Sequence, residues 1–222
     1  MALTKYNFNS FDVTSSASTG LGFNASANGF STISATSMVL IKTLTASSSS
    51  TLSFVNGSSD VVLDSTYPVY LFKYINIHPS GNGHFTVNFR DGGSNYDATK
   101  TSTFFHPYHY ENDSEAYLEY ASSSDLAQST GAQRLFQGNI DTSNDSSVSG
   151  TLHLFNPSST TFVKHFISRN NGVLHDGSNV ASRSGFCAGY CNVTAAIDGV
   201  QFAMSSGNID SGTIKLYGIK DS

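Results

Sequence analysis

The sequence predicts an all-β protein, an antiparallel β-sandwich of jelly-roll type, and three observations predict it. Hydrophobic residues make up 38% of the 222 residues and charged residues only 12%, roughly half the usual share of charge. Phe and Tyr supply all the aromatic residues, and Gly, Asn, Ser and Thr separate the apolar runs, a composition typical of strands joined by turns. Apolar residues rarely recur at helical spacing, whereas short apolar runs bounded by turn residues are frequent.

Eight such runs are expected to form strands. In chain order they are Met38–Leu44, Thr51–Val55, Val69–Ile77, His84–Phe89, Gly150–Phe155, Phe162–Ile167, Gly199–Met204 and Gly212–Ile219. In the fourth run Phe85, Val87 and Phe89 alternate with polar residues, which predicts a strand with one face on the core. Val69–Ile77 is apolar on both faces, so we expect it to be buried in the centre of the sandwich.

The domain organisation follows from the connections between the runs. We expect residues 38–222 to form one jelly-roll domain, because the Ser, Thr, Asn and Gly segments between runs are too short to separate domains. Asp113–Gln128 fits either a short helix or a strand followed by a turn, and we favour the strand because the side chains of Ala116–Tyr120 alternate. Residues 1–37 form an irregular segment, which we expect to pack on its own sandwich or to reach a neighbouring subunit as an arm.

Charge and hydropathy exclude two classes of partner. The net charge is −5 and no cluster of Lys and Arg could neutralise several phosphates, so no nucleic acid is expected. No segment approaches the roughly 18 to 20 consecutive apolar residues of a membrane span, so no membrane is expected. Met1–Asn9 lacks the apolar core of a signal peptide, which predicts synthesis in the cytoplasm.

Cys187 and Cys191 lie four residues apart. On a strand they would share a face at too great a separation for a disulfide, whereas a tight turn through Gly189 would bring them together. We favour free thiols, because cytoplasmic synthesis keeps cysteines reduced. No second pair of ligands lies nearby at the spacing of a zinc site.

The sequence contains no nucleophile elbow, P-loop, dinucleotide fingerprint or H-E-x-x-H motif, so we expect no enzyme and no cofactor. A pair of carboxylates for glycoside hydrolysis stays open, since the two residues can lie far apart in sequence. The best candidate for a metal site is His106, His109, Glu111 and Asp113, because on an extended chain the last three would project to one side. Their spacing matches no established metal signature, and we favour a solvent-facing strand or loop.

The densest aromatic cluster is the candidate binding site. It consists of Tyr108, Tyr110, Tyr117 and Tyr120, with Phe104 and Phe105 beside them. Exposed rings of this kind stack on the faces of sugars, but Tyr and Phe are also enriched in subunit interfaces. We favour an interface or core position over a glycan site.

The end of the chain resembles a known family. Ala195–Lys220, and within it Ser205–Ile209 and Ser211–Lys220 above all, looks like the closing hairpin of β-sandwich structural proteins of tailed bacteriophages, marine cyanophages especially. Ser158–Arg169 is similar to a strand of the same group, and a weaker likeness runs from Lys42 to Phe105. The resemblance covers about the last third of the chain and carries no catalytic or ligand motif.

The resemblance implies a β-sandwich in a viral setting. We expect a non-enzymatic virion structural protein, such as a capsid decoration, a head fibre or a tail accessory. Its partners would be other capsid or tail proteins and copies of itself, with a trimer as the first expectation and with open sheet edges paired between copies. The alternative is a receptor-recognition module, an adhesin or tail fibre, that binds a host surface glycan. A glycan-cleaving enzyme on the same scaffold is the third possibility.

Overall fold

The computed structural model describes residues 19–23, 26, 30–34, 37–177 and 179–220. The chain divides into one compact unit of Met1–Ser37 with Ser222 and a second of Met38–Asp221. In the first unit, β1 (Thr19–Phe23) and β2 (Phe30–Ser34) form an antiparallel hairpin in which the rings of Phe23 and Phe30 stack at 5.2 Å. Much of the segment 1–37 lies outside the described residues, and its contact with a neighbouring subunit stays a prediction.

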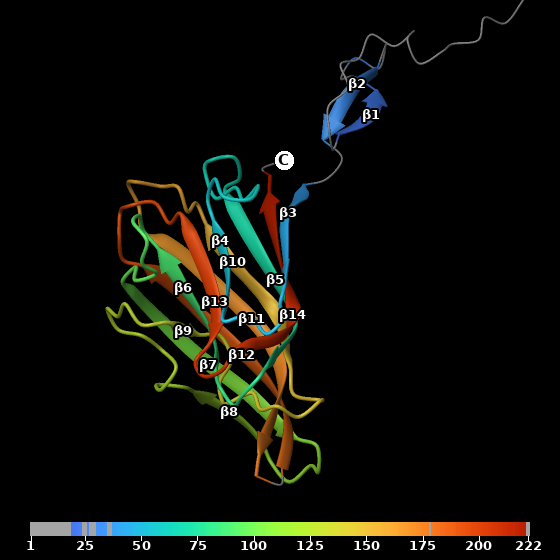
Figure 1. The fold of residues 1–222 in the computed structure, drawn as a ribbon, viewed down its shortest axis with the longest axis vertical. Coiled ribbons are helices and arrows are strands. Elements are labelled where there is room, and N and C mark those ends of the chain that lie inside the picture. Colours follow the sequence, from blue (N-terminus) through green and yellow to red (C-terminus); the bar gives the residue numbers. More distant parts are fainter. Residues whose placement is uncertain (1–18, 24–25, 27–29, 35–36, 178, 221–222) are drawn as a thin grey trace, which may run out of the picture. The chain divides into compact units, whose positions relative to one another are not determined.

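The second unit contains two antiparallel sheets, and its described residues form no helix. The larger sheet has eight strands in the order β3-β14-β5-β10-β11-β12-β7-β8, and the smaller has four in the order β4-β13-β6-β9 (Figure 1). The strands are β3 (Met38–Thr45), β4 (Thr51–Val55), β5 (Val69–Pro79), β6 (Phe85–Arg90), β7 (Lys100–Tyr110), β8 (Ala116–Tyr120), β9 (Gln133–Arg134), β10 (Val148–Phe155), β11 (Lys164–Asp176), β12 (Asn179–Cys191), β13 (Gly199–Met204) and β14 (Ile209–Ile219).

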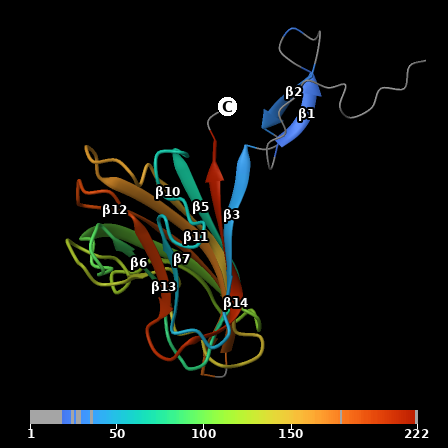
Figure 2. The ribbon, with the colours of Figure 1, turned by 45° about the horizontal axis from the view of Figure 1, so that its top comes forward.

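The two sheets pack face to face around an aromatic core. Phe72 and Tyr74 of β5 meet rings of the smaller sheet, with Phe72 5.6 Å from Phe202 of β13 and Tyr74 5.2 Å from Phe85 of β6. Figure 2 shows β13 and β6 in one layer and β5, β10, β11 and β12 in the other. The predicted all-β, sandwich-like architecture is therefore confirmed.

The predicted strands are confirmed, with one error in their burial. Each of the eight runs overlaps a strand, although β11 begins at Lys164 and not at the expected Phe162, and Ala116–Tyr120 forms β8. Phe85, Val87 and Phe89 are fully buried, as their alternation predicted. Val69–Ile77, however, is not buried on both faces, because its Lys73 is exposed. Its second face lies on the side of the larger sheet away from the smaller one, which we call the outer face, and no described residues form a layer there.

Two long strands, β7 and β12, were not among the eight expected runs. Their core-facing positions include Ser102, His106 and Gly185 in place of apolar residues, so the usual alternation is weak. Gly185 is required by a close approach of the chain, because an added Cβ would lie 2.9 Å from the carbonyl oxygen of Leu135. Gly212 is required for a different reason: its φ of +116° belongs to a β-bulge in β14, a conformation that favours glycine.

Candidate functional site

The four candidate tyrosines lie at one edge of the larger sheet, where β8 pairs with β7. In this register Tyr108 lies opposite Tyr117 and Phe105 lies opposite Tyr120. Because side chains alternate along a strand, Tyr108, Tyr110 and Tyr117 share the face that continues the core. Tyr120 lies on the outer face, so the four rings do not form one platform.

Tyr108, Tyr110 and Tyr117 form a packed group. The ring of Tyr108 lies 5.4 Å from that of Tyr110 and 6.2 Å from that of Tyr117, and the Arg183 guanidinium lies 4.9 Å from its centre. The Tyr108 hydroxyl donates to Glu115 at 2.8 Å, and this hydrogen bond to a carboxylate raises the pKa of Tyr108 to about 12. Tyr110 is buried and Tyr108 half-buried, which leaves Tyr117 as the exposed ring of the three.

Tyr120 belongs to a second aromatic group on the outer face. Phe105, opposite Tyr120, stacks on Phe186 of β12 with ring centres 4.8 Å apart, and the Arg169 guanidinium lies 5.3 Å from the centre of the Phe186 ring. The Tyr120 hydroxyl donates to Asp125 at 2.5 Å. This hydrogen bond to a carboxylate raises the pKa of Tyr120. The group is accessible, because Phe105 and Tyr120 are both exposed.

The four candidate metal ligands point to different environments. His106 is fully buried and its Nε2 lies 2.9 Å from Glu119 of β8; burial lowers the pKa of His106. His109 is exposed and pairs with Asp113 at 3.0 Å. The strand ends at Tyr110, so Glu111 and Asp113 lie in the turn before β8 and do not project with His109 along one extended strand. The favoured solvent-facing position is confirmed for His109, Glu111 and Asp113, which are exposed, and is wrong for buried His106.

A row of basic and aromatic side chains crosses the outer face. Its members lie opposite one another on successive strands, and we call it the basic–aromatic row. It runs through Thr43, Lys215, Lys73, Thr151, Arg169, Phe186, Phe105 and Tyr120. Although the whole chain has a net charge of −5, the charges along this row are all positive.

The neighbouring row on the outer face is apolar over most of its length. It consists of Leu40, Tyr217, Leu71, His153, Ile167, Ala188 and Thr103. Across the whole outer face, six large apolar or aromatic side chains are between 45% and 64% exposed, namely Met38, Leu40, Phe105, Leu118, Tyr120 and Ile167. A face with this many exposed apolar groups is typical of a protein interface.

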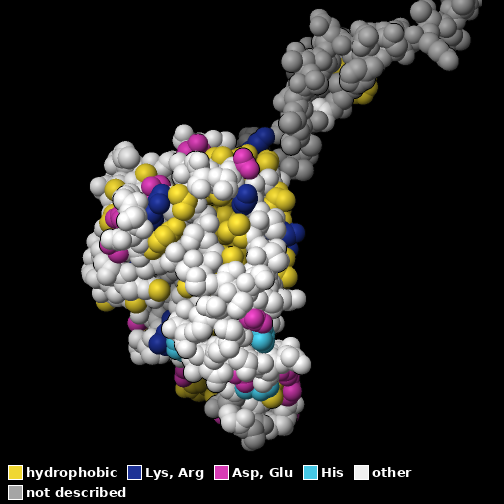
Figure 3. Space-filling view, in the orientation of Figure 1, with side chains coloured by type: hydrophobic (Ala, Val, Ile, Leu, Met, Phe, Trp, Pro, Cys, Tyr) yellow, Lys and Arg dark blue, Asp and Glu magenta, His cyan; other side chains and the backbone are white. Residues whose placement is uncertain are grey.

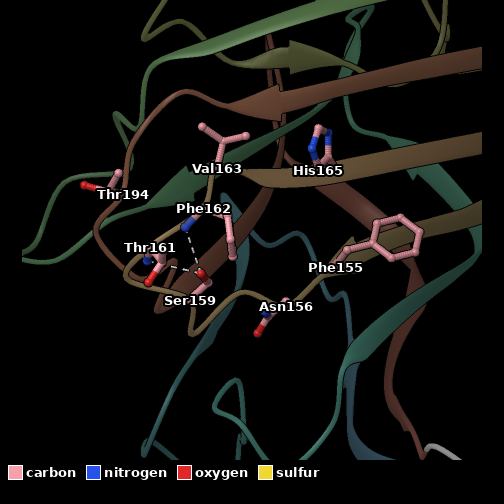
Figure 4. Close-up of a pocket in the computed structure, with 8 residues that line it drawn as sticks. All are labelled: Phe155, Asn156, Ser159, Thr161, Phe162, Val163, His165 and Thr194. Atoms are coloured by element: carbon pink, nitrogen blue, oxygen red, sulfur yellow. Dashed lines mark hydrogen bonds between the residues drawn. The ribbon is translucent and has the colours of Figure 1, made fainter.

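A shallow pocket lies where β10 ends and β11 begins. Figure 4 shows the rings of Phe155 and His165 on these neighbouring strands and the loop Ser159–Val163 that completes the pocket. Its volume is about 530 Å³, and Phe162 is 70% exposed. The lining combines aromatic rings with amide and hydroxyl groups: Phe155, Asn156, Ser159, Thr161, Phe162, Val163, His165 and Thr194.

Buried Lys164 holds the pocket loop in place. Its ammonium group donates to the carbonyl oxygens of Ser159, Phe162 and Val193 at 3.1, 3.2 and 2.9 Å. The Ser159 hydroxyl oxygen accepts hydrogen bonds from the backbone N–H groups of Thr161 and Phe162 at 3.3 and 3.0 Å. Burial lowers the pKa of Lys164, and its three acceptors offset part of that desolvation. The loop therefore presents Phe162 from a fixed backbone.

The cysteines are free, as predicted. Cys187 and Cys191 both lie on β12 and both are buried. They share the core-facing side of the strand, which keeps them too far apart for a disulfide. Burial raises the pKa of each thiol to about 12, so neither forms a reactive thiolate at neutral pH.

Histidines and some of the carboxylates lie together at one end of the second unit. Figure 3 shows them near its lower end, while uncharged polar side chains and backbone form most of the visible face. His175 lies 3.1 Å from Asp145 and 3.8 Å from Asp141. Within the described ranges, no three His, Cys, Asp or Glu residues are arranged to hold a metal ion.

Comparisons with protein-family models, with curated proteins and with solved structures find no match to this chain. The likeness of Ala195–Lys220 to phage structural proteins therefore stays a prediction. Among the described residues, no helix has the length and apolar character that a transmembrane helix requires.

Sequence reasoning did not find the outer face or the pocket. The rows on the outer face come from strands far apart in the chain, and only the strand order places Arg169 next to Phe186 and Lys73 next to Lys215. A local signal existed for the pocket alone: Phe155-Asn156-Pro157 and Thr161-Phe162 place aromatic residues next to polar ones in a loop.

Proposed function

We propose that this chain is a non-enzymatic structural protein of a tailed-phage virion, where it assembles with capsid or tail proteins and with copies of itself. The observation that carries the proposal is the outer face of the larger sheet. Covering its exposed apolar side chains lowers the free energy by roughly 25 cal/mol per Å² of apolar surface that is buried. The expected partner carries an apolar strip with carboxylates beside it, which would match Ile167 and the positive charges of Lys73, Arg169 and Lys215.

We also propose a jelly-roll topology. Support comes from the strand order when the two inserted pairs, β7–β8 and β11–β12, are set aside. The remaining order is β3-β14-β5-β10 in one sheet and β4-β13-β6-β9 in the other. If these eight strands are renumbered 1 to 8 along the chain, the larger sheet has the order 1-8-3-6 and the smaller sheet the order 2-7-4-5. This is the order of a jelly roll built from two Greek keys. The inserted pairs would then be additions that widen one sheet and enlarge its outer face.

Particle association tests the proposed role. In gradient-purified particles of the virus that encodes this chain, an antibody to the chain should label the particle. Ile167→Asp, which places a charge in the apolar row, should lower incorporation at least tenfold. Ser206→Asp adds the same charge in an exposed turn away from the outer face and should leave incorporation unchanged. A chain that stays wholly in the soluble fraction would contradict the proposal.

Glycan binding is the second candidate, and the pocket at Phe162 is the observation that favours it. An exposed ring beside Asn156, Ser159 and Thr161 offers both a stacking surface and hydrogen-bond partners, the combination that fixes small ligands in pockets. The split of the tyrosines between two faces makes this pocket a better sugar site than Tyr108 and Tyr110, which are largely packed.

A glycan array on the purified full chain tests this second candidate. If the pocket binds a sugar, Phe162→Ala should lower the signal at least tenfold, because the stacking surface is lost. Tyr117→Ala, which removes another exposed ring elsewhere, should keep the signal. Loss of signal in Tyr117→Ala alone would move the site to the tyrosine group, and an array without hits would remove the attachment role for this domain.

A further inference from the structure

Strand β8 is a free edge of the larger sheet. It is the last strand of the larger sheet, and all five of its residues are exposed. Proteins protect such edges with Lys, Pro, a bulge, an inward-pointing charge or a very short strand. Ala116–Tyr120 contains neither Lys nor Pro, and its register with β7 runs without a shift. Its one charged side chain, Glu119, points to the core side. There the Glu119 carboxylate lies 2.9 Å from Nε2 of His106 on β7, so it already has a partner and does not prevent a second strand from pairing with β8.

The backbone groups at the free side of β8 can be assigned from two hydrogen bonds. Tyr110 N–H donates to the carbonyl of Glu115, and Ala121 N–H donates to the carbonyl of Phe104. In an antiparallel pair the residues bonded to one neighbour recur at every second position. Odd-numbered residues of β8 therefore turn their N–H and C=O groups toward β7. Ala116, Leu118 and Tyr120 turn theirs toward the free side.

We propose that β8 pairs with β8 of a second copy of this chain, antiparallel and centred on Leu118. In this register Leu118 faces Leu118 of the second copy, and Ala116 faces Tyr120. Both are hydrogen-bonded pairs that use the outward backbone groups. The small side chain of Ala116 then lies beside the large ring of Tyr120. On the other face Tyr117 lies opposite Glu119 of the second copy, and the Tyr117 hydroxyl can donate to that carboxylate.

The neighbouring two-fold registers oppose like charges. Centring the pair on Tyr117 would place Glu115 opposite Glu119 of the second copy. Centring it on Glu119 would place that carboxylate opposite itself on the two-fold axis. Like charges directly opposite each other destabilise a strand pair, so the Leu118-centred register is preferred. An isologous contact of this kind closes as a dimer.

The pairing joins the larger sheets of two copies into one continuous sheet. It brings the two groups of Phe105, Leu118 and Tyr120 together across the axis, so the exposed aromatic ends of two basic–aromatic rows meet. The inference rests on the proposed assembly role, since it names a second copy as one partner. It replaces the expected trimer with a dimer.

Light scattering on the purified full chain tests the pairing. The wild type should have the mass of two chains. Leu118→Lys should halve it, because two ammonium groups would meet on the axis, and its thermal midpoint should show that the fold persists. Ile167→Lys introduces the same charge at a similarly exposed position in the middle of the outer face and should stay dimeric. A monomeric wild type, or an unchanged mass for Leu118→Lys, would overturn the inference.

Thiol cross-linking tests the register. Cys187 and Cys191 are buried, so a short bifunctional thiol reagent should react with an introduced, exposed cysteine. It joins two chains only where the two introduced cysteines lie close together. Leu118→Cys should give a covalent dimer, and Phe162→Cys should give none; the reverse pattern would overturn the register. A monomer that still enters particles would refute the pairing alone, and a dimer absent from particles would refute the proposed virion role alone.

Discussion

Phe202→Ala is expected to lower the free energy of unfolding by about 3–5 kcal/mol, the usual cost of removing a buried ring. Phe202 is fully buried at the centre of the aromatic core. Its ring lies 5.8 Å from Phe85 of its own sheet, and 5.6 and 6.5 Å from Phe72 and Tyr74 of the larger sheet. The substitution therefore opens a cavity between the two layers, where rigid strands on both sides limit collapse.

Urea unfolding of the full chain measures this loss of stability. Both proteins are compared at the same concentration, because self-association adds to the apparent stability. Phe162→Ala is the control, since that ring is 70% exposed and should change stability by no more than about 0.5 kcal/mol. Equal effects of the two substitutions would show that the packing of β13 against β5 does not hold the sheets together.

Asn170→Ala is expected to lower the free energy of unfolding by about 2–4 kcal/mol. The substitution leaves two buried backbone groups without hydrogen-bond partners, at a cost of about 1–3 kcal/mol each. The Asn170 amide donates to the carbonyl of Leu135 at 2.5 Å, and its oxygen accepts from the N–H of Gly185 at 3.2 Å. These bonds tie the segment after β9 to β11 and β12. No water can replace the lost partners readily, because Asn170 is only 4% exposed.

Asn171→Ala is the matched control for this prediction. Asn171 has the same side chain on the same strand but on the opposite face. It is exposed, and its amide donates to Ser182, Arg183 and Ser184 at 3.0–3.1 Å. Water can take over these bonds, so the free energy of unfolding should change by less than about 1 kcal/mol. A larger loss in Asn171→Ala than in Asn170→Ala would show that the outer-face ladder, not the buried bridge, positions these strands.

The predictable part of the fold is the part whose strands alternate. Phe85, Val87 and Phe89 were assigned to the core because a period of two leaves one face apolar, and the structure buries all three. The strands β7 and β12 escaped prediction because their core-facing positions hold residues such as Ser102, His106 and Gly185. These positions are satisfied by contacts distant in sequence, such as the hydrogen bond from Ser102 to Gln133, and local propensity carries no trace of such contacts.

The candidate site divides in the same way. The sequence located the aromatic segment Phe104–Tyr120, and it predicted the alternation within β8 that separates Tyr117 from Tyr120. It did not predict that Tyr108 would be packed beneath Arg183, because that neighbour comes from β12, more than 70 residues along the chain. The sequence therefore indicated one aromatic cluster, whereas the structure divides its tyrosines between the two faces of the sheet.

By itself the sequence determined an all-β chain, the positions of most strands, and free cysteines, because each depends on residue type and short spacing. The tertiary structure decided which strands are neighbours, and therefore which side chains share a face. Only the pairing of β11 with β12, and of β12 with β7, builds the basic–aromatic row from Arg169, Phe186 and Phe105. Only the place of β8 at the end of that order leaves Ala116–Tyr120 as an open edge. Strand order is set by contacts between distant segments, and these contacts are the property that a single sequence does not display.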